Sequence, residues 1–302
     1  MPKPKTGKPL DGIVLLDKPL GLSSNAALQR AKRIFNARKA GHTGSLDPLA
    51  TGVLPICFGE ATKVSSFLLD SDKRYTTVAA LGETRTTGDK EGEVVQTRDI
   101  PEMTQESIEA VLTQFRGDIE QIPPMHSALK HEGTPLYKLA RQGISIERKV
   151  RHVHIYELNL LEFTADSFTL DVKCSKGTYI RTLVEDIGEV LTCGAHLSYL
   201  RRTEVTPFNS QVIYTLDELE ALAEQSELGN TLLPIDHAIP HWPMLTLNEE
   251  DTQRLCNGIR VTLDNVPEAD GIRLYGPDGK FLGVGQRHES GQLAAKRLLR
   301  TD

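Results

Sequence analysis

The sequence predicts an α+β protein: a mixed, mostly antiparallel sheet flanked by helices, followed by a small β-rich C-terminal domain. Strand-like runs and helical patterns are interspersed without the regular βαβ alternation of a parallel sheet. The chain has 302 residues, which is enough for about two domains. Its final part consists of short strand-like runs and a hairpin signal. We therefore expect a main domain over residues 1–246 and a second domain over residues 247–302.

The first elements follow from local patterns. Residues 11–18 (DGIVLLDK) are an apolar run and indicate a strand. Ser23 or Ser24 can cap a helix, because apolar residues recur at helical spacing after them. Residues 41–63 are rich in Gly, Thr and Pro, so we expect a structured loop region more than a regular element. Residues 74–81 (RYTTVAAL) indicate a second strand.

The middle of the chain continues this mixture. Thr104 can cap a second helix with one apolar stripe. Residues 121–143 contain three prolines and should begin as an irregular surface segment. Residues 153–163 and 168–174 alternate well enough to be paired strands. Residues 179–191 carry apolar side chains at helical spacing and predict a third helix.

The C-terminal part has its own signals. Asn248 precedes three acidic residues, which favours a helix start at the positive end of the helix dipole. Residues 272–275 and 281–286 flank a Pro-Asp-Gly turn and predict a hairpin. We expect this compact unit to be joined to the main domain through the proline-containing residues 234–243.

The charge of the chain is uneven. Its net charge of −6 speaks against a nucleic-acid partner. However, residues 1–70 hold ten Lys and Arg against five Asp and Glu, and residues 121–155 hold six against two. Residues 211–253 hold nine Asp and Glu and no Lys or Arg. Composition alone leaves open whether the basic stretches bind phosphates or are simply solvated.

Cysteine usage and hydropathy limit the class of protein. The four cysteines stand far apart without a C-x-x-C pair, which argues against a zinc site or disulfides and favours a reducing cytoplasm. No apolar run approaches the roughly 20 residues that span a bilayer. The basic start, residues 1–5, is followed by no signal-peptide core, so we expect a cytoplasmic protein.

The most informative stretch is residues 41–52 (GHTGSLDPLATG), which displays Asp47 on a loop. An aspartate before proline commonly starts a turn or caps a helix. The stretch lacks the G-K-[ST] of a phosphate-binding loop and any metal-ligand spacing. The residues alone therefore leave a structural and a catalytic role for Asp47 open.

Longer motifs identify a family. Residues 41–63 (GHTGSLDPLATGVLPICFGEATK) closely resemble the catalytic motif of the stand-alone, bacterial TruB-type tRNA pseudouridine-55 synthases. The resemblance continues, in the same order, in further motifs: residues 73–75 (KRY), 121–128 (QIPPMHSA), 174–181 (CSKGTYIR) and 193–202 (CGAHLSYLRR). It implies a pseudouridine synthase fold and, for the tail, a PUA-like RNA-binding domain.

The resemblance also implies residue roles. Asp47 matches the catalytic aspartate, Tyr75 the tyrosine that stacks on the target base, and Arg181 the arginine that pairs with the aspartate. Four further residues match positions at the substrate: His42, Tyr179 and Leu200 around the base, and Lys18 beside the site, where we expect support instead of chemistry. Without the resemblance, the residues alone favour a half-buried strand position for Tyr75 and core positions for Tyr179 and Leu200.

The implied activity is isomerisation of uridine 55 in the T-loop of tRNA, with base flipping and an aspartate nucleophile. Such an isomerisation needs no redox change, so we expect no cofactor and no metal. The expected partner is the tRNA T-stem-loop, without guide RNA or membrane, and the expected state is a monomer. Candidate phosphate contacts are basic residues on the first helix and in the middle segment: Arg30, Arg33, Lys39, Arg141, Arg148, Lys149 and Arg151. The acidic residues 211–253 should face away from RNA.

Three other functions stay open at this point. A pure RNA-binding or chaperone protein would not need Asp47, Tyr75 and Arg181 together. A guide-RNA-dependent relative of the dyskerin type would carry a longer, Lys-rich tail. A methyltransferase would show a Gly-rich cofactor loop after its early strands.

Overall fold

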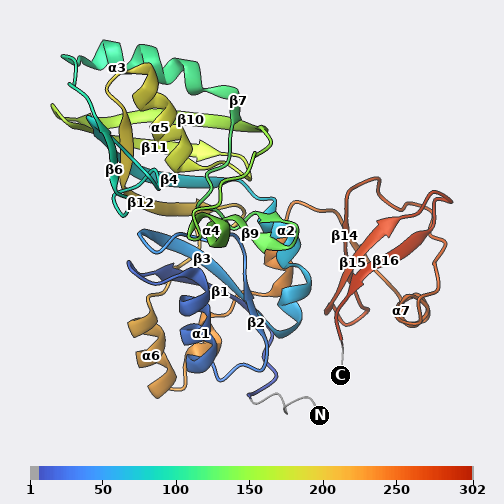
Figure 1. Cartoon of the computed structure of the whole chain (residues 1–302). Helices are drawn as coiled ribbons and strands as arrows, with labels where there is room; N and C mark the ends of the chain where they lie inside the picture. Colours follow the sequence, from blue (N-terminus) through green and yellow to red (C-terminus); the bar gives the residue numbers. More distant parts are fainter. Residues whose placement is uncertain (1–6, 301–302) are drawn as a thin grey trace.

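The computed structural model of the chain describes residues 7–300, so the basic start at residues 1–5 lies outside the described residues. Figure 1 shows a large part of helices and strands with a smaller, strand-rich part beside it. The predicted α+β class is confirmed, because one eight-stranded sheet carries helices and nearly all of its strand pairs are antiparallel. Within residues 7–300, no helix is both long and apolar enough to cross a membrane.

The large sheet has the strand order β1-β3-β12-β4-β11-β10-β7, with β2 beside β3. Its strands are, in chain order: β1 (Gly12–Lys18), β2 (Ala40–His42), β3 (Ala50–Phe58), β4 (Lys73–Leu81), β7 (Gly117–Gln121), β10 (Arg151–Phe163), β11 (Ser167–Cys174) and β12 (Ala195–Val205). Short two-stranded sheets pair β5 (Glu83–Arg85) with β6 (Val94–Thr97) and β8 (Lys130–His131) with β9 (Thr134–Pro135).

The helices lie on and around this sheet. They are α1 (Ser24–Ile34), α2 (Ser65–Leu69), α3 (Gln105–Leu112), α4 (Leu136–Ala140), α5 (Ile180–Val190) and α6 (Leu216–Glu224), with 3-10 turns η1 (Gly59–Lys63), η2 (Thr113–Phe115), η3 (Leu228–Thr231) and η4 (Ile235–Ala238). The predicted caps are confirmed at Ser23, which accepts from Ala26, and at Thr104, which accepts from Ser107.

Strand β12 occupies the middle of the large sheet. It pairs in parallel with β3 on one side and antiparallel with β4 on the other. This register places Leu200 between Ala50 and Thr77, and it places Arg202 beside Tyr75. Residues far apart in the sequence thus meet across three neighbouring strands.

The expectation of a loop over residues 41–63 was wrong in part. The loop is confined to residues 43–49, and β3 after it is a strand in which every residue but Thr51 is buried. A strand buried on both faces shows no alternation, and its Gly52 and Pro55 resemble loop signals. Gly52 is required by close packing, since a Cβ atom there would lie 2.1 Å from the Arg202 carbonyl oxygen.

The C-terminal part is a four-stranded sheet with one helix. Its elements are β13 (Met244–Thr246), α7 (Glu249–Cys256), β14 (Ile272–Tyr275), β15 (Phe281–Arg287) and β16 (Leu293–Leu298). The predicted cap at Asn248 and the hairpin between β14 and β15 are confirmed. The domain boundary at residue 246 stays a prediction. Strand β13 lies before this boundary, although it pairs with β14, which lies after it. Phe67 packs edge-on against Trp242, with ring centroids 4.6 Å apart.

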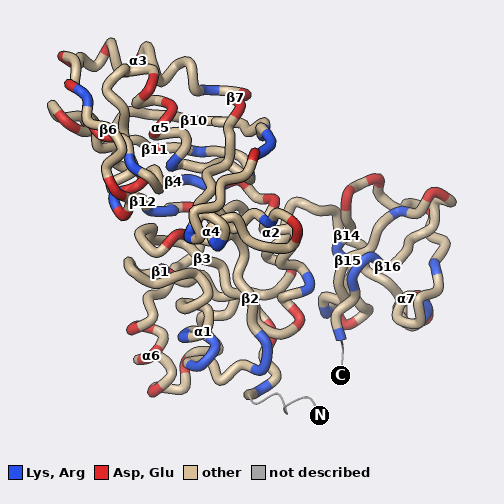
Figure 2. Tube along the Cα trace, in the orientation of Figure 1, with Lys and Arg blue, Asp and Glu red and all other residues tan. Residues whose placement is uncertain are grey.

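The acidic helix α6 lies beside the basic helix α1 (Figures 1 and 2). Arg30 of α1 forms an ion pair with Glu220 of α6 at 3.1 Å. Part of the basic face that we expected to meet phosphates is therefore paired within the protein.

Helix α5 can approach β12 closely because residue 188 is a glycine. A Cβ atom at Gly188 would lie 2.3 Å from the backbone nitrogen of Ala195. Gly188→Ala should lower the free energy of unfolding by about 1–3 kcal/mol, since overpacking outweighs the better helix propensity of alanine. Urea denaturation would measure this change.

Gly229→Ala is the matched control, because nothing lies within 4 Å of a Cβ atom at that glycine. It should change stability by less than about 0.5 kcal/mol. Equal stabilities of the two variants would contradict the close contact between α5 and β12.

Candidate active site

The loop over residues 43–49 holds Asp47 between β2 and β3. Ser24, at the start of α1, fixes this loop: its buried hydroxyl accepts from the Leu46 amide at 2.7 Å and donates to the Leu46 carbonyl at 2.9 Å. Gly44 has a left-handed φ of +68°, which a glycine adopts without strain. The position of Asp47 thus depends on contacts to a helix some twenty residues earlier.

Lys18 supports the loop from below. Its fully buried ammonium group donates to the carbonyls of Pro19 and Leu22, at 2.9 and 2.6 Å, and approaches the Pro48 carbonyl at 3.5 Å. Burial lowers the pKa of Lys18 to about 8, although the charge of Asp47 opposes this shift. Lys18 lines neither of the two cavities beside Asp47.

Asp47 forms an ion pair with Arg181. The Arg181 Nη2 atom lies 3.0 Å from the Asp47 Oδ2 atom. The buried guanidinium also donates to the carbonyls of Thr87 at 2.8 Å and His126 at 2.6 Å. A second carboxylate, that of Asp89, lies 3.5 Å from Arg181. The Arg181 guanidinium therefore connects its own helix to three other segments of the chain, those of Asp47, of Thr87 and Asp89, and of His126, and it faces two acids.

The pKa of Asp47 is raised above its ordinary value. Burial is the largest cause, and the negative charge of Asp89 adds to it. The charges of Arg181 and Lys18 act in the opposite direction without cancelling the effect of burial. The Asp47 side chain nevertheless keeps 43% of its surface exposed to the space beside it, so a ligand can reach it.

A cavity of about 300 Å³ opens at Asp47. Tyr75 of β4 and Leu200 of β12 are buried in its wall, and Tyr179 and Arg181 complete the side formed by the start of α5. Five of the seven sequence-predicted site residues therefore line one cavity: Asp47, Tyr75, Tyr179, Arg181 and Leu200.

A second cavity of about 520 Å³ lies on the other side of Asp47. It is lined by His42, His126, Tyr137 and Arg141, among others. Burial lowers the pKa of His42, and the charge of Arg202 lowers it further. The side chain of His42 is therefore neutral at pH 7. Among the basic residues that we expected to contact phosphates, Arg141 lines this cavity.

Gln121 holds the start of α5 in place. Its buried amide accepts from the Tyr179 backbone nitrogen at 3.0 Å and donates to the Tyr179 carbonyl at 3.2 Å. The side chain of Tyr179 does not cap the start of α5. The two hydrogen bonds from Gln121 to the Tyr179 backbone therefore help to fix the start of the helix. Residues that the sequence reasoning missed include Gln121, Asp89, Lys73 and Arg202, because only the folded chain brings them to the site.

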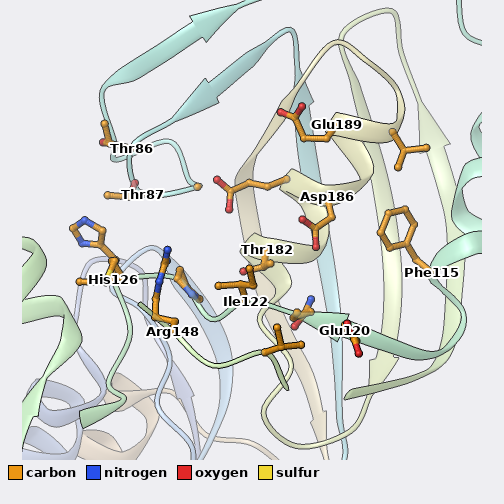
Figure 3. A pocket seen from close by; sticks show the side chains of 17 residues that line it. Thr86, Thr87, Phe115, Glu120, Ile122, His126, Arg148, Thr182, Asp186 and Glu189 are labelled. Atoms are coloured by element: carbon orange, nitrogen blue, oxygen red, sulfur yellow. The ribbon is translucent and has the colours of Figure 1, made fainter. Parts of the chain in front are cut away.

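A third cavity, of about 810 Å³, does not include Asp47 in its lining. Figure 3 shows Asp186 and Glu189 of α5 on one side of it, with Arg148 and His126 on another. Burial raises the pKa of Glu185 to about 7 and that of Asp186 to about 6. Within residues 7–300, no group of three or more His, Cys, Asp or Glu side chains is placed to hold a metal ion.

Comparison with known proteins assigns family matches along the chain. Residues 32–180 match the TruB family pseudouridylate synthase N-terminal domain, and residues 181–240 the tRNA pseudouridylate synthase B C-terminal domain. Residues 243–299 match the Pseudouridine synthase II TruB C-terminal domain. A tRNA pseudouridine synthase B of Pseudomonas fluorescens is 54% identical over 298 residues, which cover 97% of each chain. One of Mannheimia succiniciproducens is 50% identical over 299 residues and 98% of each chain.

Solved structures share the fold. A chain in the crystal structure of a Cbf5-Nop10-Gar1 complex superposes with a TM-score of 0.72 at 25% identity, covering 96% of this chain and 84% of that chain. A chain in an H/ACA RNP bound to a substrate RNA containing 2'-deoxyuridine superposes with a TM-score of 0.73 at 22% identity, covering 99% and 92%. The second likeness concerns the fold alone.

The buried acid Glu185 should make stability depend on pH. Because its pKa is raised to about 7, the folded state holds this proton at pH values where the unfolded chain has lost it. The contribution to stability is full below the ordinary glutamate pKa and is lost as pH rises through about 7. Glu185→Gln should therefore increase the free energy of unfolding at pH 8 by about 1 kcal/mol or more, with little change at pH 5.

Thermal unfolding of the variant at both pH values would test this effect. Glu189→Gln is the control, because Glu189 is half-exposed and paired with Arg98 at the surface, where an ion pair contributes little. A Glu185→Gln variant that is less stable than the wild type at pH 8 would refute the argument.

Proposed function

The chain belongs to the TruB family of pseudouridylate synthases, which makes it an isomerase, and we propose that it converts uridine 55 in the T-loop of tRNA to pseudouridine with Asp47 as the nucleophile. The matches cover nearly the whole chain, and the relatives named tRNA pseudouridine synthase B are at least half identical to it. The observation that carries the proposal is the ion pair between Asp47 and Arg181 at the edge of a base-sized cavity.

The chemistry fits a carboxylate in this position. The reaction breaks the bond from N1 of uracil to C1′ of the ribose and forms a bond from C5 to C1′. A carboxylate nucleophile divides this change into easier steps. Arg181 forms an ion pair with the carboxylate, and its positive charge favours the ionised form. The buried contacts of Arg181 to two backbone carbonyls keep the guanidinium in place.

The substrate uridine must leave its stack to reach Asp47. Flipping a nucleotide costs a few kcal/mol, and stacking on an aromatic ring recovers about 1–3 kcal/mol. Tyr75 and Tyr179 both present aromatic rings to the cavity, which Leu200 also lines. In this proposal Tyr75 stacks on the uracil, Leu200 and Tyr179 shape the pocket, and His42 fills space beside the flipped nucleotide.

The proposed substrate is the T-stem-loop of a free tRNA, bound without a guide RNA by a monomer in the cytoplasm. Arg141 lines the cavity next to Asp47, and in this proposal it contacts the RNA strand. The proposed second domain, residues 247–302, would add RNA contacts as a PUA-like unit. No cofactor enters the proposal.

Release of tritium from uridine C5 would test the activity directly. Purified protein, added alone to tRNA labelled at C5, should release label to water without guide RNA or cofactor. Asp47→Asn should abolish release while the affinity for tRNA changes by less than about tenfold, equal to 1.4 kcal/mol. Asp166→Asn, at an exposed turn, should behave like the wild type. Normal release by Asp47→Asn would refute the nucleophile, and a silent wild type would refute the activity.

The raised pKa of Asp47 predicts how the rate depends on pH. Only the ionised carboxylate is a nucleophile, and a raised pKa means that it becomes protonated before an ordinary aspartate does. The single-turnover rate should therefore fall on the acid side at a pH clearly above 4. A rate that stayed constant down to pH 4 in the folded enzyme would contradict this assignment.

A further inference from the structure

Two cations lie in the floor of the cavity at Asp47. Lys73 starts β4 and Arg202 lies on β12, and the two side chains are 8% and 1% exposed. Both line the cavity, and both lie against Gly44: a Cβ atom there would be 3.4 Å from Arg202 Nη1 and 3.9 Å from Lys73 Cε. The loop that bears Asp47 therefore rests directly on them.

Neither cation has a carboxylate partner. Among the ion pairs of residues 7–300, none includes Lys73 or Arg202. Lys73 donates to backbone carbonyls, those of Leu69 at 3.0 Å and Ser71. Arg202 donates to the carbonyls of Val53 at 2.7 Å and Gly44 at 3.1 Å. Backbone carbonyls thus satisfy the hydrogen bonds of both cations. The charges of Asp72 and Asp70 act on Lys73 without forming an ion pair with it.

A buried charge without an opposite charge is unfavourable, and these two positive charges also repel each other. Burial and the charge of Arg202 lower the pKa of Lys73 to about 8, so Lys73 is still mostly charged at neutral pH. A pocket with such an excess of positive charge is suited to a ligand that becomes negative.

We propose that Lys73 and Arg202 form a cationic floor that stabilises the negative charge developing on the uracil ring during the reaction. This inference rests on the proposed function. When the N1–C1′ bond breaks, its electron pair moves onto the ring. C5 then bonds to C1′, any bond between C1′ and the Asp47 carboxylate breaks in the same step, the proton on C5 leaves, and N1 gains a proton. Addition of a carboxylate to the ring would also push negative charge onto it, so the floor acts in either order of steps.

Both residues are positioning residues, because their charges act on the uracil without forming a bond to it. A fixed positive charge close to a developing anion is worth far more in a water-poor site than in water. The charge is needed in the transition state and not in the bound ground state. Its removal should therefore lower the maximal rate and leave the affinity for RNA nearly unchanged.

The test compares RNA substrates that carry uridine or 5-fluorouridine at the target position. Fluorine withdraws electrons, so the fluorinated ring carries negative charge more readily and needs less help. With enzyme in excess, Lys73→Met should slow the loss of uridine by about 10- to 100-fold. The factor by which Lys73→Met slows the loss of 5-fluorouridine should be several-fold smaller. Lys73→Arg, which keeps the charge, should restore most of the rate on uridine.

Arg202→Met should show the same substrate difference, and the neighbouring Arg201→Met is its control, because Arg201 pairs with Asp17 outside the cavity. Lys73→Met keeps the inference testable if Arg202→Met does not fold. Equal slowing on both substrates would show a structural role only, and weaker RNA binding with an unchanged maximal rate would show a phosphate contact. Either result overturns the cationic floor. A wild type inactive on uridine would instead refute the proposed function.

Discussion

The contact between Asp47 and Arg181 is the constraint on which the rest of the site depends. Arg181 can reach Asp47 only because α5 lies close to β12, and Asp47 can meet it only because Ser24 holds the loop. Asp89 also forms an ion pair with Arg181, so the positive charge of the guanidinium is shared between two carboxylates. Burial raises the pKa of Asp47 despite this partner, so the charge of Arg181 opposes protonation of the carboxylate without cancelling the effect of burial.

Much of the fold could be predicted where one face of an element is buried. The alternation in β10 and β11, the helical spacing in α5 and the caps at Ser23, Thr104 and Asn248 all appear in the structure as expected. Strand β3 was missed, because burial on both faces removes the alternation on which the prediction relies. Gly52 and Pro55 added signals that are typical of loops but here serve close packing.

The site could be predicted only through long motifs. Asp47, Tyr75 and Arg181 were found because their surroundings resemble a family, whereas an aspartate before a proline has many ordinary roles. Asp89 lies in a polar turn, and Arg202 follows another arginine in a strand, so neither stands out in the sequence. Their importance arises from register and loop closure, which place them against Arg181 and Gly44. Lys18, in contrast, lies under the loop as a support.

The central place of β12 has a consequence for synthesis on the ribosome. The strands before it form two separate groups, β1 with β3 and β4 with β11, β10 and β7, and only β12 pairs with both. A nascent chain that ends before residue 195 thus lacks the strand that joins Asp47 to Tyr75. The pocket can close only after about two thirds of the polypeptide has been translated, so N-terminal fragments, however well folded locally, contain no complete site.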